Sequence, residues 1–559
     1  MLHVPNSTPR GRRTGMVLAS IPLLAALLGI TACPSGSTSS SGSGGSAGST
    51  FRGETIPARA SSIFANSPYS AAPFAGRSIV DVIADPAKIV AAVSRDQIGM
   101  NLALFYDVTH RDLPAEVASV HPRILRWPGG SSADTYHWRT QTECNPSNNQ
   151  LTSAYDPRST FENFMHDIVI PGHYDVAITV NYGSNETCTG GGDPREAAAW
   201  VAYAKRKGYD RYIKYWTVGN EEFGNWEYDL HSHSHDPMTY AKAVSGPDGY
   251  YALMKAADPA AKIGVVVTGA GGAYHDWDNI VLTHARYDFV ELHFYAQQPG
   301  HESDRYLLFD APEKLASVIA TLRGELAAAG RPHTPIMLGE FNSVTYAPGK
   351  QTVSIVNGLF TGLAFGEVLN HGLAAAAWWF GAGGDQNCNN NNSSSLYGWQ
   401  NFGGYDLVAA HTKWNWNGCG DGIVVPKGTL FPSGDAFSMV SRFAQPGAMM
   451  LAVSIRPSVP DVRAYADALK HGEYALMLFN LDESESIKVT ISVAGARRAS
   501  YRASTITYDK RMYDLSRNNI WVQPKSAKLG KVGATPTLTL PPWSMTFLKL
   551  APTRATMRR

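Results

Sequence analysis

The chain has 559 residues, which is longer than one ordinary domain, although α/β barrels can reach such lengths. Its formal net charge is only +1, so the charge balance indicates neither a nucleic-acid partner nor an anionic surface. Tryptophan and tyrosine are plentiful, at 13 and 26 residues, and such side chains either fill cores or stack on sugars.

The N-terminus predicts export. Arginines at positions 10, 12 and 13 precede an apolar run over 16–30, which ends in Ile30 and is followed by Thr31-Ala32-Cys33. This pattern is a signal peptide whose end resembles a bacterial lipobox, so residues 1–33 are predicted to be a signal segment with lipidation at Cys33. An ordinary signal peptide with a chance cysteine is the alternative. The Ser/Gly-rich residues 34–50 predict a flexible tether. We therefore expect an exported bacterial lipoprotein, held by its lipid on the cell surface or a periplasm-facing membrane without a spanning helix.

Four further cysteines follow the predicted signal segment. An even number in an oxidising compartment favours two disulfides, and sequence order favours Cys144–Cys188 and Cys388–Cys419. Four unpaired thiols are the alternative. No C-x-x-C spacing occurs, so zinc ligation is not expected.

Strand and helix patterns alternate between residues 97 and 436, after a lead-in over 51–96. The predicted strands are 98–104, 124–127, 175–181, 212–218, 262–268, 289–295, 335–341 and 375–380, and helical patterns cover 194–207, 237–257, 311–329 and 354–371. Eight strands in this alternation predict a parallel (β/α)8 TIM barrel, with a doubly wound open sheet as the alternative. The Asn/Ser/Gly/Trp-rich stretch 385–434 is either a long loop over the barrel mouth or an ordinary insertion.

A second pattern begins at residue 437. Six strand-like segments with no strong helix between them predict a C-terminal antiparallel β-sandwich over 437–552, at 450–456, 462–470, 473–480, 486–493, 498–507 and 537–550. The alternating segment 78–83 precedes the barrel and is expected to complete this sandwich. Residues 553–559 are predicted to be a tail.

Polar and aromatic residues gather at the predicted strand ends, where barrel active sites lie. Two of them are carboxylic acids on opposite strands, Glu221 after the fourth and Glu340 after the seventh. Two such carboxyls perform glycosidic bond cleavage, as acid and nucleophile or as acid and base. Glu222 is the rival of Glu221, but neighbours in an extended chain point opposite ways, so only one can face a substrate. Glu291, inside the sixth strand, is expected to pair with a base.

The joint pattern resembles clan A glycoside hydrolases, and within that clan the α-L-arabinofuranosidases of family 51. The residues that carry the resemblance are Arg126 with Pro128-Gly129-Gly130, Asn220-Glu221, His293 with Tyr295, Gly339-Glu340-Phe341-Asn342, and Trp378. The resemblance runs from about residue 79 to the C-terminus.

The resemblance implies a role for each rim residue. Glu221 would be the general acid/base and Glu340 the nucleophile of a retaining enzyme. Asn220 would bind the sugar 2-hydroxyl, Tyr295 would hold the nucleophile with His293 nearby, Arg126 would keep Glu340 ionised, and Trp378 would form the subsite floor. Trp127 and Asn181, at the neighbouring strand ends, are also expected to contact substrate. No cofactor or metal is required, and His231, His233 and His235 are expected to be a polar loop.

The expected substrate is arabinose-containing hemicellulose or pectin. The chain departs from the family at the first strand, which carries Gly99-Met100-Asn101 instead of a Glu-His pair, and at the seventh, which reads Gly-Glu-Phe-Asn instead of Asp-Glu-Trp-Asn. The alternatives are therefore a β-xylosidase, a β-glucuronidase or an endo-acting hemicellulase. A surface lipoprotein that binds glycans without catalysis is a separate alternative.

Overall fold

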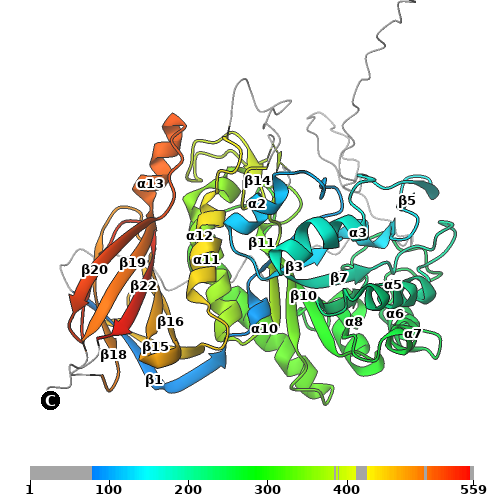
Figure 1. Ribbon diagram of the computed structural model, residues 1–559, viewed down its shortest axis with the longest axis horizontal. Helices are drawn as coiled ribbons and strands as arrows, with labels where there is room; N and C mark the ends of the chain where they lie inside the picture. The colour runs from blue at the N-terminus through cyan, green and yellow to red at the C-terminus, as the bar shows by residue number, and fades with distance from the viewer. Residues whose placement is uncertain (1–78, 383–385, 388–389, 411–424, 497–499, 554–559) are drawn as a thin grey trace, which may run out of the picture. The chain divides into compact units, whose positions relative to one another are not determined.

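A computed structural model describes residues 79–382, 386–387, 390–410, 425–496 and 500–553. These residues contain two β assemblies, a closed barrel and a nine-stranded sheet (Figure 1). None of the described helices combines the length and apolar character needed to cross a bilayer. The predicted signal segment, the tether, Cys33 and the Cys388–Cys419 pair lie outside the described residues.

The barrel has eight parallel strands, and this confirms the predicted fold. The strand order is β10-β11-β12-β2-β3-β7-β8-β9. β2 and β12, the first and last barrel strands along the chain, pair through Gly99 and Ala377 and close the barrel. The bounds are β2 Gly99–Asn101, β3 Ile124–Trp127, β7 Asp175–Val180, β8 Ile213–Val218, β9 Ile263–Val267, β10 Phe289–Gln297, β11 Ile336–Val344 and β12 Ala375–Trp378.

Helices connect most of these strands. They are α2 Leu113–Ser119, α3 Phe161–Asn163, η4 Phe164–Val169, α4 Ile170–Gly172, α5 Pro194–Lys207, α6 Pro237–Ser245, α7 Tyr250–Ala257, α8 Ala273–His284, α9 Asp304–Phe309, α10 Ala311–Ala328 and α11 Ile355–Asn370. The single helix predicted over 237–257 is two helices, because Gly246-Pro247 ends α6 and Gly249 caps the start of α7. In α10 the buried residues Leu315, Ile319, Leu322 and Leu326 recur at helical spacing, so one face packs on the core.

The second sheet has the order β20-β19-β22-β17-β16-β15-β1-β18-β21. Its strands are β1 Val80–Ala92, β15 Met449–Arg456, β16 Val462–Ala468, β17 Tyr474–Asn480, β18 Ile487–Val493, β19 Tyr501–Asp509, β20 Lys525–Val532, β21 Thr537–Leu540 and β22 Ser544–Pro552. Figure 1 shows β1, in blue, among the orange and red strands of the C-terminal part. The early strand therefore belongs to the β domain, as predicted.

The sheet differs from the prediction at β1. This strand is antiparallel to β15, where Val82 pairs with Ile455, and parallel to β18, where Val82 pairs with Ile491. The sheet is consequently mixed rather than purely antiparallel. No hairpin joins β1 to either neighbour, because the whole barrel intervenes, so no short turn fixes its direction. Alternate residues of β18 are buried and meet apolar residues of β17 and β22 in one core.

Three other features differ from the prediction: the end of one strand, one strand that was not predicted, and the boundary between the two domains. The strand predicted over 537–550 is interrupted at Pro541-Pro542, which cannot donate ladder hydrogen bonds, and becomes β21 and β22. Strand β20 is almost wholly exposed and Lys-rich, so it has no apolar alternation to reveal it. Helix α12, Pro432–Phe443, spans the predicted boundary at 436/437 and packs on α11 as well as on β17 and β22.

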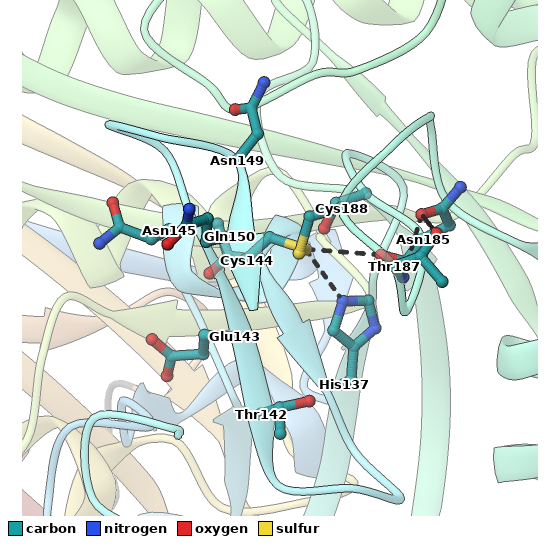
Figure 2. Close-up of a disulfide and its surroundings, with 12 residues drawn as sticks. His137, Thr142, Glu143, Cys144, Asn145, Asn149, Gln150, Asn185, Thr187 and Cys188 are labelled. Carbon is teal, nitrogen blue, oxygen red and sulfur yellow. Dashed lines mark hydrogen bonds between the residues drawn. A yellow bond between two sulfur atoms is a disulfide. The ribbon is translucent and has the colours of Figure 1, made fainter. Parts of the chain in front are cut away.

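A small sheet lies in the loop after β3, with β4 Tyr136–His137, β5 Thr142–Asn145 and β6 Gln150–Ser153. Cys144 of β5 forms a disulfide with Cys188 in the loop after β7, with Cα atoms 5.5 Å apart, as predicted. Figure 2 shows this bond beside His137 and Asn185. A short pair, β13 Gln386–Asn387 and β14 Gly403–Gly404, belongs to the stretch after β12.

Candidate active site

The chain turns sharply where β8 ends. Gly219 has φ 75° and Glu221 has φ 45°, so both adopt the left-handed backbone conformation that residues other than glycine rarely adopt. A Cβ atom at position 219 would lie 2.3 Å from Glu222 Oε1, so only glycine fits there. The turn sends the neighbouring acids to different places: the Glu221 side chain keeps 19% of its surface exposed, whereas Glu222 is fully buried.

Glu340 is held at both carboxylate oxygens. Arg126 Nη1 donates to Oε1 at 2.7 Å, and the Tyr295 hydroxyl donates to Oε2 at 2.8 Å. Arg126 is fully buried, and its Nε lies 2.7 Å from Glu291 Oε1. Burial opposes the charge of this guanidinium, but Glu291 and Glu340 raise its pKa above the usual value. Burial and the Glu340 charge raise the pKa of Tyr295 far above its usual value, so its hydroxyl stays a donor.

Glu221 shares a proton with His293. Glu221 Oε1 lies 2.8 Å from His293 Nδ1, and Trp226 Nε1 donates to Glu221 Oε2 at 2.8 Å. Burial alone would lower the pKa of His293, but the surrounding carboxylates, Glu340 first, raise it to about 10. Burial likewise opposes ionisation of Glu221, yet the contacts with His293 and Trp226 lower its pKa. The pair therefore holds one proton that resides on the imidazole and can move to the carboxylate.

The two acids lie close enough for a shared reaction centre. One polar atom from each of Glu221, His293 and Glu340 lies within 4.8 Å of the others. Retaining glycosidases separate their carboxyls by about 5–5.5 Å, whereas inverting ones need about 6.5–9.5 Å. This trio is also the one group of possible metal ligands within the described residues, but a protonated imidazole has no lone pair to offer a metal.

Asn220 is fixed by three contacts. Its Oδ1 accepts from Arg126 Nη2 at 2.8 Å, its Nδ2 donates to Glu227 Oε1 at 3.0 Å, and its backbone N–H donates to Asp134 Oδ2 at 3.0 Å. Burial raises the pKa of Asp134 to about 6 and raises that of Glu222 and Glu227 well above their usual value. A protonated Glu222 can donate to Asp134, so the buried cluster behind the turn carries less negative charge than three carboxylates would.

The sequence reasoning did not identify this cluster. Asp134 lies in η3, Ser131–Asp134, which follows the Pro-Gly-Gly segment after β3. Nothing in the spacing of Asp134, Glu222 and Glu227 indicates that they meet. The contact depends on how two separate loops fold back, which a single sequence does not encode as a periodic pattern.

The structure brings Glu221, Glu340, Arg126, Asn220, His293 and Tyr295 together, but it does not bring Trp127, Trp378 or Asn181 to the acids. Trp127 is fully buried and stacks on Phe164 at 5.2 Å between ring centroids. Trp378 is fully buried against Phe341 and Phe365. Asn181 uses its amide to hold the loop, with Nδ2 donating to the Tyr136 carbonyl at 3.1 Å.

The expected sugar contacts of Trp127 and Trp378 are therefore wrong. Successive strand residues face opposite sides, and since Arg126 faces the barrel interior, Trp127 must face the helices. The same alternation turns Trp378 outward and places the side chain of Trp379, which is partly exposed, at the mouth of the barrel. A Cβ atom on Gly130 would lie 2.8 Å from the Trp379 ring, so the ring lies directly over this glycine.

Comparison with known proteins supports the fold. No protein family model matches the chain. The fold is that of the family 51 α-L-arabinofuranosidases. The α-L-arabinofuranosidase of Thermotoga maritima superposes with a TM-score of 0.62 at 17% identity, covering 85% of this chain and 100% of that one. The family 51 enzyme of Thermotoga petrophila gives 0.60 at 18% identity, covering 84% and 99%.

A xyloglucanase also shares the fold, and one fungal protein matches part of the sequence. A family 44 xyloglucanase from Paenibacillus polymyxa gives a TM-score of 0.58 at 12% identity, covering 85% of this chain and 100% of that one. In sequence, the chain is 25% identical over 232 residues to a probable α-L-arabinofuranosidase C from Aspergillus flavus. That match covers 37% of this chain and 39% of the fungal protein, so it spans only about two fifths of the relative's length.

Proposed function

We propose that this protein is a retaining glycoside hydrolase in which Glu340 is the nucleophile and Glu221 the general acid/base. The observation that carries the proposal is the placement of two carboxylates, with polar atoms within 4.8 Å, in opposite environments. Arg126 and Tyr295 hold one of them as an oriented anion. The other shares a proton with His293 and stays partly exposed, where a leaving oxygen can reach it.

The first step follows from these contacts. A Glu340 oxygen attacks the anomeric carbon and forms a carbon–oxygen bond while the glycosidic bond breaks. The proton held by Glu221 and His293 passes to the leaving oxygen through Glu221, which is the partner that solvent can reach. Arg126 and Tyr295 fix the nucleophile in position before the substrate arrives.

The second step reverses the roles. Once Glu340 is esterified it is neutral, and His293 loses one of the carboxylates that raise its pKa. Glu221 then takes a proton from water, whose oxygen attacks the anomeric carbon and releases Glu340. Two displacements at one carbon return the original anomeric configuration.

We propose α-L-arabinofuranosides as the substrate class, on the resemblance of the motifs and on the solved structures of that activity with the same fold. An endo-acting hemicellulase is the second candidate, because a xyloglucanase superposes almost as well. Comparing rates on nitrophenyl α-L-arabinofuranoside, β-xyloside and β-glucuronide tests the first, and a higher rate on either pyranoside would overturn it. A rapid fall in xyloglucan or xylan viscosity with few new reducing ends would favour the second.

The mechanism is tested by two variants. Glu340→Ala should abolish cleavage of nitrophenyl glycosides, because no group remains to attack. Glu221→Ala should still form the ester from a good leaving group but hydrolyse it slowly, and added azide should restore turnover and give a glycosyl azide of retained configuration. An inverted first product in the wild-type reaction, or full activity of Glu340→Ala, would contradict the assignment. Binding of polysaccharide without any cleavage would instead support a non-catalytic glycan-binding protein.

We also propose that the mature protein is anchored to a membrane through lipid on Cys33. The support is the basic and apolar segment before it and the Ser/Gly tether after it. Labelling of the expressed protein with radioactive palmitate tests this, with Cys33→Ala as the matched control. Equal label in both proteins, or none in either, would exclude lipidation at this residue.

A further inference from the structure

An exposed aromatic cluster lies beside Glu221. Four aromatic side chains are prominently exposed among the described residues, and two of them, Trp226 and Tyr274, lie together with ring centroids 6.1 Å apart. Trp226 is 49% exposed and Tyr274 is 42% exposed. Trp226 comes from the loop after β8, and Tyr274 comes from the irregular first turn of α8, which follows β9. β8 and β9 are neighbouring strands of the barrel.

The cluster is anchored to the core through Phe223. The Phe223 ring lies 5.0 Å from Tyr274, 6.0 Å from Trp226 and 6.0 Å from Trp277, as measured between ring centroids. Trp277 is fully buried, and its Nε1 donates to the Val266 carbonyl of β9 at 2.9 Å. The exposed rings therefore rest on a rigid base, which reduces the entropy that they lose when they bind a ligand.

The backbone next to Trp226 and the backbone at Tyr274 both have conformations that place these two rings. A Cβ atom at Gly224 would lie 2.2 Å from the Trp226 ring, so the ring folds tightly onto this glycine. Tyr274, His275 and Asp276 have φ values of 51°, 58° and 61°, a conformation that such residues rarely adopt. Unfavourable backbone conformations of this kind gather at ligand-binding sites, where they place particular side chains.

The position of the rings identifies what they would bind. Trp226 Nε1 donates to Glu221 Oε2, so the cluster lies on the acid side of the reaction centre. A general acid protonates the glycosidic oxygen, and the sugar that departs lies on that side. The apolar C–H face of a pyranose stacks on aromatic rings, whereas the hydroxyls at its edge stay in water.

We propose that Trp226 and Tyr274 form a binding subsite for a pyranose unit of the leaving group. The inference rests on the proposed function for its orientation, and it adds the class of sugar that departs. The bound polymer would then present its backbone to these rings while the sugar to be removed enters the barrel mouth. Substrates with a pyranose leaving group should be preferred over those with a small one.

A binding experiment tests the subsite apart from catalysis. Xylotriose is titrated calorimetrically into the Glu340→Gln protein, with and without Tyr274→Ala. We expect Tyr274→Ala to weaken binding about tenfold, Tyr274→Phe to retain it, and Tyr155→Ala to leave it unchanged. Tyr155 is 70% exposed but packs near Phe105, outside the cluster, so it is the matched control. Equal affinity of Tyr274→Ala and its parent, or no binding by the parent, would overturn the proposal.

A kinetic experiment then links the subsite to the reaction. The ratio of kcat/KM for α-L-arabinofuranosyl-xylotriose to that for methyl α-L-arabinofuranoside should fall about tenfold in Tyr274→Ala, mainly through KM. An unchanged ratio would refute a leaving-group subsite. If the wild type cleaves neither compound, the proposed function fails, while the titration still decides whether the rings bind a pyranose.

Discussion

Removal of the Cys144–Cys188 disulfide should loosen the support of the active site. The bond joins β5 to the loop after β7, close to the segment that Asp134 holds. One Asp134 oxygen accepts from the backbone N–H groups of Tyr182 and Gly183, and the other accepts from that of Asn220. The perturbation is the double variant Cys144→Ala/Cys188→Ala.

The magnitude follows from the length of chain that the bond closes. The two cysteines are 44 residues apart, and the loss of loop-closure entropy corresponds to about 4 kcal/mol at 25 °C. Unfolding entropy near Tm is about 2.1 cal/mol/K per residue, so in a protein of 559 residues the loss corresponds to a fall in Tm of about 3 °C. Both cysteines are almost fully buried, so reductant should act only slowly on the folded protein.

Thermal unfolding followed by circular dichroism measures the effect. The double variant should melt lower than the wild type. Cys388→Ala/Cys419→Ala protein that is reduced in urea and refolded with reductant should melt below the same protein left oxidised, by the same difference. Cys388→Ala/Cys419→Ala is the background for this reduction, because it lacks the other predicted pair, so the reductant acts on Cys144–Cys188. A fall of less than about 1 °C would show that the loop contacts, rather than the covalent bond, carry the stability.

Three further predictions concern single side chains. Arg126→Lys keeps the charge but loses the two guanidinium N–H groups that donate to Glu340 and Asn220. We expect kcat to fall about 100-fold or more at unchanged secondary structure. A kcat near that of the wild type would contradict the role of these two hydrogen bonds. Trp226→Phe removes a hydrogen-bond donor that lowers the pKa of Glu221, so the pKa of Glu221 should rise. The alkaline limb of the kcat/KM profile should then move to higher pH. A shift to lower pH would contradict this role of Trp226. Burial raises the pKa of Asp467 to about 8, above the ordinary value of an unfolded chain, so folded protein keeps a proton that unfolded protein loses. Wild-type Tm should therefore fall as pH rises from about 4 to about 8 and then level off, and Asp467→Asn should remove that part of the slope; an equal slope in both proteins would refute the assignment.

The barrel could be predicted because its strands carry strong local signals. Segments such as β7 and β9 are short, largely apolar and rich in β-branched residues, and polar or glycine-rich stretches bound them. Parallel strands share one carboxyl edge, so counting them was enough to predict that Glu221 and Glu340 converge. The acid–histidine–arginine network follows from the same count, because its members lie on β3, β10 and β11 and in the turn after β8.

The remaining features depend on side-chain direction and on loop folding. The alternation that turns Arg126 inward and Trp127 outward was available in the sequence, and applying it at β12 would have identified Trp379 instead of Trp378. By contrast, β20 has no apolar face, and its pairing with β19 stabilises a strand that its own residues do not favour. The aromatic cluster of Trp226 and Tyr274 joins two loops, so no spacing in the chain reveals it.

The contrast between Glu221 and Glu222 explains how the site keeps its charge. Burial raises the pKa of Glu222, so it contributes no negative charge behind the turn, whereas Glu221 faces the mouth as a carboxylate paired with His293. Glu221, Glu291 and Glu340 then supply three negative charges, and Arg126 and His293 supply two positive ones. In the proposed mechanism, this net charge of −1 would lie next to the anomeric carbon and would favour the oxocarbenium-like transition state, in which positive charge develops. If Glu222 were also ionised, its charge would raise the pKa of the neighbouring acids and work against the proton arrangement that Glu221 and His293 share.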